Sequence, residues 1–334
     1  MNRRIAAITN PYAAGGRVGK MWPQIAQKLR GRLGELALRQ TDSAGHATQI
    51  ARDLIESGYD LIIAVGGDGT MNEVANGFLR EDEPLNPEAT LGIFPVGTGA
   101  DFQRTLGVPS SVDRAIDILA EGRALAIDVG KIRFTGQDGS PCQRYLVNLA
   151  SFGMGGDVAA TVKNHLAVFG GKTAFMWATL KTLARYRGRR VEIEIDNCGK
   201  ALPFFITNVA VGNGQYHGGG MHPCPYAVVD DGLLEVTVID YLKLFELVRD
   251  IRVLYSDNIY SHPKVHHLRA RRIVATADEP TQIEVDGEPL GRLPLEIEVL
   301  PRRLPVLLSP SSPLFNISSQ NQQPSAASAE GTCR

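Results

Sequence analysis

The most constraining stretch of this 334-residue sequence is an apolar run that ends in a glycine turn. Leu61-Ile62-Ile63-Ala64-Val65 leads directly into Gly66-Gly67-Asp68-Gly69-Thr70. Aliphatic residues running into glycines predict a buried parallel strand followed by a tight turn. Met71 to Leu79 has the apolar spacing of a helix, and we expect Thr70 to cap it. Free N–H groups and the positive end of the helix dipole then meet at one place, which predicts an anion site.

Asp68 makes this anion site unusual, because a carboxylate repels a bare phosphate. A divalent cation between the two groups removes the conflict. The alternative is an ordinary strand-to-helix turn, and two glycines alone do not decide between these interpretations. The aspartate inside the turn favours a nucleotide-phosphate site.

Length and composition exclude several classes of protein. A chain of 334 residues suggests two domains. A net charge of -1 argues against a general nucleic-acid binder. No segment approaches the ~20 consecutive apolar residues of a membrane span. The cysteines are scattered without a C-x-x-C pair, which favours reduced thiols and a cytoplasmic protein.

The order of the elements predicts an N-terminal α/β domain followed by a β domain. Strand and helix patterns alternate to about residue 125, and a second glycine turn, Gly97-Thr98-Gly99, follows the strand at 91–96. Beyond Asp128 short strands dominate, with helical insertions at about 155–186 and 242–257. We therefore expect a doubly wound parallel domain over 1–128, a mostly antiparallel β-sandwich over 129–308 with a cleft between them, and a disordered tail over 309–334.

The sequence also resembles the diacylglycerol kinase catalytic-domain superfamily, in its bacterial soluble lipid kinase branch. The resemblance covers about residues 3–308 and rests on motifs in both halves. These are Gly66-Gly67-Asp68-Gly69-Thr70-x-Asn72-Glu73, Gly97-Thr98-Gly99-x-Asp101-Phe102, Gly212-Asn213-Gly214-x-Tyr216-x-Gly218-Gly219-Gly220, Asp231-Gly232-Leu233-Leu234-Glu235 and Asp286-Gly287-Glu288. The resemblance implies an NAD-kinase-like N-terminal fold and transfer of the γ-phosphoryl group of ATP to a lipid hydroxyl, with Mg²⁺.

The family's site residues can be carried over to matching positions of this chain. Asp68 and Asp101 would hold the Mg²⁺ and its waters. Asp286 or Glu288 would take the proton of the acceptor hydroxyl. Asp231, with main-chain oxygens of Val228 and Leu233, would hold a second, structural Mg²⁺. The nucleotide would be contacted by Thr41, Gly66, Gly67, Asp68, Gly69, Thr70, Met71, Asn72 and Thr98.

Alternatives remain open at this point. Asp286-Gly287 by itself is typical of a type I′ hairpin turn, and Asp230-Asp231-Gly232 suits a turn as well as a metal site. Ala100 and Gln103 stand where the family usually has asparagine and alanine, which bears on nucleotide preference or rate. The rival functions are an NAD-kinase-like or other non-lipid kinase, and a catalytically weak nucleotide- or lipid-binding relative. The retained aspartates favour an active lipid kinase.

A basic run bears on where such an enzyme would work. Arg185, Arg187, Arg189 and Arg190 follow the apolar residues Phe169, Phe175, Met176 and Trp177. A solvated helix end above core aromatics is one interpretation, and docking on anionic lipid headgroups is the other. With a lipid substrate we expect peripheral contact with the inner face of the membrane. The sequence leaves open which lipid is phosphorylated and whether the chain forms a homodimer.

Overall fold

The predicted strand at 61–65 lies in the middle of a parallel sheet in the computed structural model, which describes residues 3–13, 15–96, 101–165, 182, 185–250, 252–253 and 256–321. The strand order in this part is β6-β3-β1-β2. Its elements are β1 (Ile5–Thr9), β2 (Ala37–Gln40), β3 (Leu61–Gly66), β6 (Thr90–Pro95), α1 (Arg17–Leu33), α2 (His46–Glu56), α3 (Asp68–Asn76), α4 (Asp101–Thr105) and α5 (Val112–Glu121), with a small hairpin of β4 (Leu79–Arg80) and β5 (Glu83–Pro84).

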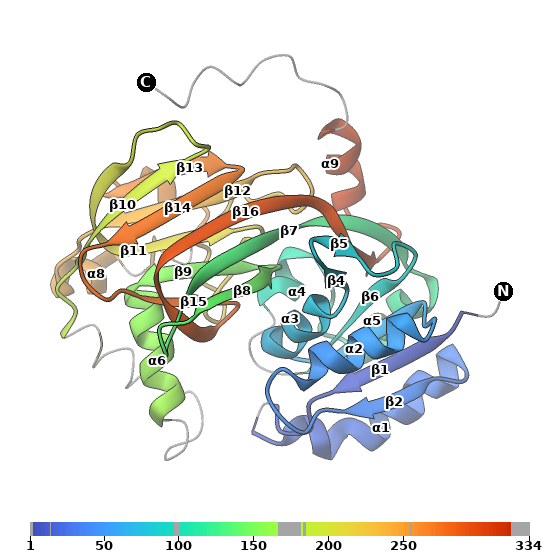
Figure 1. The fold of residues 1–334 in the computed structure, drawn as a ribbon. Coiled ribbons are helices and arrows are strands. Elements are labelled where there is room, and N and C mark those ends of the chain that lie inside the picture. Colours follow the sequence, from blue (N-terminus) through green and yellow to red (C-terminus); the bar gives the residue numbers. More distant parts are fainter. Residues whose placement is uncertain are drawn as a thin grey trace.

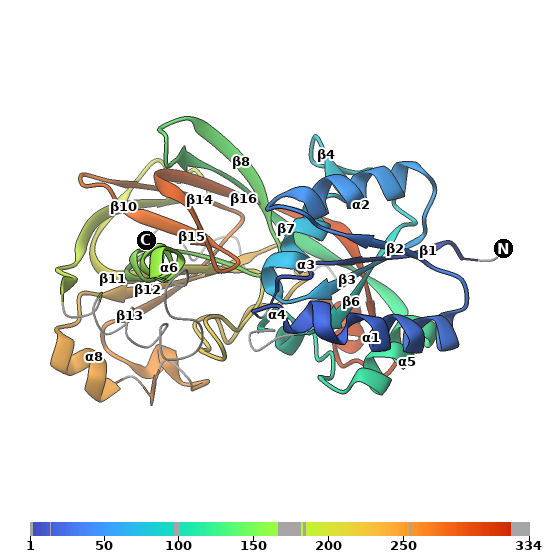
Figure 2. The ribbon, with the colours of Figure 1, turned by 90° about the horizontal axis from the view of Figure 1, so that it is seen from below.

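Helices cover both faces of this parallel sheet (Figures 1 and 2). Ile62 and Ala64 of β3 pack with α2 and α3 in one hydrophobic cluster. Ile63 and Val65 of the same strand pack with α1 and α5 in another. Alternate residues of a strand point to opposite faces, so an apolar run buried on both sides gives a doubly wound layer.

The remaining chain forms antiparallel strands around a separate core, as the change of sequence pattern predicted. Figure 1 shows this β-rich part beside the α/β part. Its elements are β7 (Arg123–Gly136), β8 (Pro141–Leu146), β9 (Leu149–Gly153), α6 (Met154–His165), β10 (Arg189–Ile195), β11 (Leu202–Gly212), β12 (Leu234–Asp240), α8 (Leu244–Asp250), the 3-10 helix η2 (Ile259–Ser261), β13 (Val265–Ala270), β14 (Arg272–Ala277), β15 (Gln282–Val285), β16 (Glu288–Leu308) and α9 (Leu314–Asn321).

Two long strands join the two parts into one continuous sheet. β16 pairs antiparallel with β7 from Gly291↔Gly136 to Leu308↔Arg123, and Val306 pairs parallel with Leu91 of β6. β7 therefore runs across residue 128, where we place the domain boundary from the sequence. The buried Asp128 ties this junction together, because its carboxylate accepts hydrogen bonds from Gly232 N at 2.6 Å and Arg302 N at 2.8 Å.

Several local predictions need correction. Helix α3 begins at Asp68 with Gly67 as its N-cap, so Thr70 lies inside the helix and does not cap it. Residues 314–321, expected to be disordered, form α9, and Leu314 and Phe315 pack against the α/β core. This apolar pair is easily missed within a polar tail. The predicted helical insertions are described only in part: α6 covers residues 154–165 and α8 covers 244–250, and most of the first insertion beyond His165 lies outside the described residues.

No helix in the described ranges combines the length and apolar character needed to cross a bilayer.

Candidate active site

The glycine turn between β3 and α3 contains two glycines with different surroundings. A Cβ on Gly66 would lie 2.7 Å from Thr70 Oγ1 and 2.8 Å from Thr70 Cβ, so packing within the turn requires glycine there. Among the described residues, no atom would lie within 4 Å of a Cβ on Gly67, and Gly67 has φ -92°. None of the described neighbours therefore requires glycine at Gly67. Open space at a helix N-terminus is suited to a ligand that approaches the backbone closely.

Asp68 joins this turn to the next helix. Its carboxylate accepts hydrogen bonds from Asp101 N at 3.1 Å and Phe102 N at 3.2 Å, and these N–H groups belong to the first turn of α4. The Asp101 carboxylate accepts one from Gly219 N at 2.7 Å, and Arg104 Nη1 lies 3.5 Å from its other oxygen. Burial raises the pKa of Asp101, and the negative charge of Asp68 raises it further. Two carboxylates predicted to hold Mg²⁺ thus lie close together.

Asp286 reaches the same region from the β-rich part. It occupies the two-residue turn between β15 and β16, with φ 48° at Asp286 and 86° at Gly287. The hairpin-turn interpretation of Asp286-Gly287 is therefore confirmed, and it is compatible with a site role. Burial raises the pKa of Asp286 to about 7, and the charge of Asp68 contributes to the increase.

Four donors surround the Asp286 carboxylate. Oδ1 accepts hydrogen bonds from Asn148 N at 3.1 Å and Leu149 N at 2.8 Å. Oδ2 accepts hydrogen bonds from Val147 N at 3.3 Å and from the side-chain amide of Asn72. A carboxylate offers about four lone-pair positions, so these bonds nearly saturate it. Asn72, predicted to contact the nucleotide, thereby links α3 directly to the Asp286 turn.

Sequence reasoning assigned no role to several residues that build this junction. The Asn76 amide donates to Tyr145 O at 2.8 Å and accepts from Tyr145 N at 2.9 Å, which fixes α3 against β8. Asn148 N donates to Asp286, and Asn148 O accepts from Gly214 N at 2.8 Å. The spacing Asn72-x-x-x-Asn76 places both amides on one helix face, and this signal was present in the sequence.

An ion pair between the partly buried His217 and the buried Glu284 adjoins the carboxylates and was also missed. His217 Nε2 lies 2.8 Å from Glu284 Oε1. Burial alone lowers the pKa of His217, but the negative charge of Glu284, and those of Asp101 and Asp286, raise it to about 9. His217 lies within the glycine-rich segment at an unspecified position of the motif. Nothing in the sequence links it to Glu284, which lies far along the chain.

The other predicted site residues have more varied positions. Glu288 lies beside the turn, since a Cβ on Gly69 would be 3.4 Å from Glu288 Oε1. Thr41 is buried directly after β2, and its N–H donates to Thr9 O at 3.0 Å. Met71 is buried in α3. Thr98, Ala100 and the rest of the second glycine turn lie outside the described residues.

The predicted structural metal site has a different set of contacts here. The Asp231 carboxylate pairs with Arg269 and accepts a hydrogen bond from Leu233 N at 3.0 Å. Burial raises the pKa of Asp231, and Arg269 opposes this increase. Among the described residues, no group of three or more His, Cys, Asp or Glu side chains is arranged to hold a metal ion. Metal binding by Asp231 with the Val228 and Leu233 carbonyls stays a prediction.

Comparison with known families identifies both halves of the chain. Residues 4–132 match the diacylglycerol kinase catalytic domain, and residues 148–308 match the YegS C-terminal NAD kinase beta sandwich-like domain. A diacylglycerol kinase of Staphylococcus saprophyticus is 31% identical over 299 residues, which is 88% of this chain and 92% of the relative. The chain belongs to the diacylglycerol kinase family. It is therefore a lipid kinase of that family, and its catalytic domain is that of an ATP-using kinase.

Other relatives agree with this membership. The diacylglycerol kinase of Bacillus subtilis is 31% identical to this kinase over 310 residues, covering 92% of this chain and 96% of the relative. The crystal structure of a putative diacylglycerol kinase from Bacillus anthracis superposes with a TM-score of 0.71 at 27% identity, covering 92% of this chain and 98% of that one. The two-part fold predicted from the sequence is confirmed.

Proposed function

We propose that this kinase transfers the γ-phosphoryl group of ATP to the hydroxyl of a membrane lipid such as diacylglycerol, phosphatidylglycerol or a sphingoid base. The observation that carries the proposal is the convergence of Asp68 and Asp101 from the α/β part with Asp286 from the β-rich part. Phosphoryl transfer depends on positioning and charge neutralisation more than on covalent chemistry. Acidic groups from two parts of the chain, next to an open glycine turn, suit that requirement.

The α3 N-terminus is the proposed phosphate site. The space over Gly67, which holds no atom of the described residues, and the N–H groups of a helix start favour phosphate oxygens. We propose that residues 66–72 wrap the phosphates, with Thr41 and Thr98 as further contacts to the nucleotide. Asp68 lies in the first turn of the helix, where a bare phosphate would meet its negative charge.

Asp68 and Asp101 fit a magnesium ion by their chemistry. Both offer carboxylate oxygens, which Mg²⁺ prefers, and the charge of Asp68 raises the pKa of Asp101, so a cation nearby would relieve their repulsion. Mg²⁺ commonly uses one or two carboxylates together with phosphates and water, so two protein ligands suffice. When bound, the ion would neutralise charge on the phosphates. In the proposed division of the chain at residue 128, both ligands belong to the nucleotide-binding domain.

Asp286 is the proposed base for the acceptor hydroxyl, with Glu288 as the alternative. A pKa of about 7 suits a group that must accept a proton near neutral pH. The Val147 N–H, at 3.3 Å, makes the longest backbone hydrogen bond to Asp286, and the lipid hydroxyl would displace it most easily. Glu288 is less buried and lies beside Gly69, next to the proposed phosphate site.

A substrate panel tests the proposed reaction. Purified kinase would be given γ-labelled ATP with diacylglycerol, phosphatidylglycerol, a sphingoid base or a polyprenol in mixed micelles, and NAD would serve as the non-lipid comparison. We expect transfer to at least one lipid and none to NAD. Labelling of NAD alone would replace the proposal by the NAD-kinase-like alternative. ATP binding without transfer to any acceptor would support the catalytically weak relative.

Substitutions and pH distinguish the two candidate bases. We expect Asp286→Ala to abolish transfer while ATP binding persists, and Glu288→Gln to retain part of the activity. Because a base works only when deprotonated, kcat/KM should fall as pH decreases below about 7, the pKa of Asp286. Asp286→Asn, which preserves the shape of the side chain, controls for misfolding. Full activity of Asp286→Asn together with an inactive Glu288→Gln would assign the base to Glu288.

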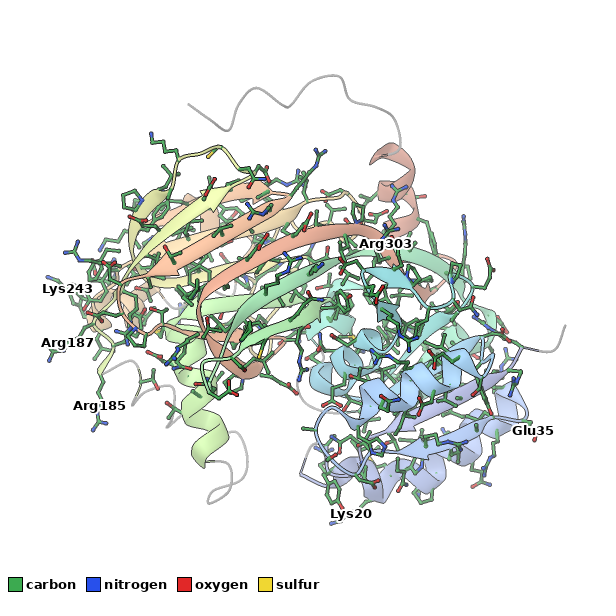
Figure 3. The ribbon with its side chains drawn as sticks, viewed as in Figure 1. Lys20, Glu35, Arg185, Arg187, Lys243 and Arg303 are labelled. Atoms are coloured by element: carbon green, nitrogen blue, oxygen red, sulfur yellow. The ribbon has the colours of Figure 1, made fainter. Side chains whose placement is uncertain are left out.

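We also propose that one end of the β-rich part docks on anionic membrane. Phe205 of β11, which pairs with Arg190 at the start of β10, and Leu244 and Phe245 of α8 are exposed, with Phe245 64% accessible. Basic side chains lie at the same end, and Figure 3 shows them pointing outward. They include Arg185, Arg187 and Lys243. Apolar groups beside basic ones suit a lipid surface with negative headgroups.

A further inference from the structure

Glu284 is a buried carboxylate beside the proposed catalytic residues, and it makes three polar contacts of its own. The residue is 1% exposed and lies at the end of β15. Oε1 accepts a hydrogen bond from Ser151 Oγ at 2.8 Å and lies 2.8 Å from His217 Nε2. Oε2 accepts one from Gly287 N at 3.0 Å. One carboxylate thus connects β9, the glycine-rich segment and the hairpin turn.

Each of these connections leads to a group of the candidate active site. Gly287 directly follows Asp286, so the Glu284 carboxylate holds the turn that presents the proposed base. His217 lies two residues before Gly219, whose N–H donates to Asp101 at 2.7 Å. The turn at 217–221 is closed by His217 N donating to Met221 O at 3.0 Å. The pair therefore connects the backbone that holds Asp286 to the backbone that holds Asp101.

We propose that His217 and Glu284 are positioning residues for phosphoryl transfer, forming a charged brace that holds the Asp286 turn in place relative to Asp101. The proposal rests on the proposed function of the site. Burying charged side chains is favourable only if they are paired and hydrogen-bonded. Glu284 has His217 as its charged partner, and Ser151 and Gly287 donate hydrogen bonds to it. Removal of one partner leaves an uncompensated buried charge and frees the turn. His217 is charged at neutral pH, in keeping with a pKa of about 9.

Kinetics of His217→Gln and Glu284→Gln test the brace. Glutamine in place of His217 can still donate a hydrogen bond but carries no charge. We expect kcat to fall about 10- to 100-fold, since a displacement of ~1 Å can cost on the order of 100-fold. The KM values for ATP and lipid should remain near those of the wild type, because the brace touches neither proposed substrate contact.

A matched control separates the brace from a general effect of losing a histidine. His262 Nε2 lies 3.3 Å from Asp250 Oδ2, and its side chain is 13% exposed, against 17% for His217. His262→Gln should leave kcat unchanged. Ser151→Ala provides a milder variant, because it removes one hydrogen bond to Glu284 without exposing a charge. It should lower kcat less than Glu284→Gln and keep the brace testable if the charged variants do not fold.

Two measurements on the unliganded protein do not depend on activity. In an NMR titration, the His217 imidazole should stay protonated above pH 8 in the wild type and lose its proton at lower pH in Glu284→Gln. Hydrogen exchange at Gly287 should accelerate in Glu284→Gln and in His217→Gln. Normal exchange and normal kcat in both variants would overturn the brace. If the wild type transfers phosphate to no lipid while exchange accelerates as expected, the proposed function fails and the brace stands.

Discussion

At the scale of single residues, adjacent glycines in the phosphate turn have separable roles. Gly66 is required by the Thr70 side chain, whereas Gly67 faces open space. Both belong to one motif in the sequence. The sequence alone does not show whether packing within the protein or the approach of a ligand requires glycine at each position. The distinction depends on atoms four residues along the helix and on the absence of any protein atom near Gly67 among the described residues.

Alanine substitutions at these positions should therefore give opposite results. Gly66→Ala forces a Cβ into Thr70 and should lower the free energy of unfolding by about 1–3 kcal/mol, as overpacking does. Gly67→Ala should leave stability unchanged and raise the KM for ATP, because the added methyl group occupies the space proposed for phosphate. Urea unfolding and ATP titration measure the two effects. An unchanged KM for ATP in Gly67→Ala would show that the phosphates do not bind at this position.

At the scale of elements, the start of α2 is held by a side chain that lies far away in the sequence. Thr41, Asp42 and Ser43 resemble capping residues, but α2 begins at His46 and its N-cap is Gly45. The cap is instead provided by Glu73 of α3, whose carboxylate accepts hydrogen bonds from Gly45 N at 2.8 Å and Ala47 N at 3.2 Å. Glu73 adjoins the nucleotide motif in sequence, yet its side chain holds a neighbouring helix.

Glu73→Ala should therefore reduce stability with little effect on catalysis. Loss of two acceptors at a helix N-terminus should lower the free energy of unfolding by about 1–3 kcal/mol. The exposed Glu35 on the same part of the molecule provides a control, and Glu35→Ala should unfold at the wild-type urea concentration. Unchanged stability in Glu73→Ala, or a loss of kcat in the folded variant, would contradict this role.

At the scale of the whole molecule, the proposed docking end unites residues from β11, α8 and the chain before β10. Arg185, Arg187 and Lys243 point outward at this end of the molecule. Sequence reasoning identified the arginines but associated them with Phe169, Phe175, Met176 and Trp177, which lie outside the described residues. The exposed Phe205 and Phe245 were not anticipated, because only the fold brings them to the arginines.

Vesicle sedimentation measures this docking. We expect binding to phosphatidylglycerol vesicles that weakens as salt increases. Arg185→Glu combined with Arg187→Glu should weaken it about 30-fold, taking about 1 kcal/mol for each basic residue lost. Phe245→Ala should weaken it in low and high salt alike. Ile317→Ala, an exposed apolar change on α9, should have no effect. Equal binding to neutral and anionic vesicles would contradict the docking proposal.

The sequence alone determined the division into an α/β part and a β-rich part. It also indicated a phosphate site with aspartates beside it. Buried strands, glycine turns and helical spacing depend on neighbouring residues, so β3, its turn and α3 could be predicted, and the aspartates could be named. Tertiary structure decided which groups each aspartate meets. Asp68 binds the start of α4, Asp101 binds Gly219, and Asp286 binds the backbone after β8 and Asn72. These partners are far apart in the chain, and local propensity carries no information about contacts that form only when two cores pack together.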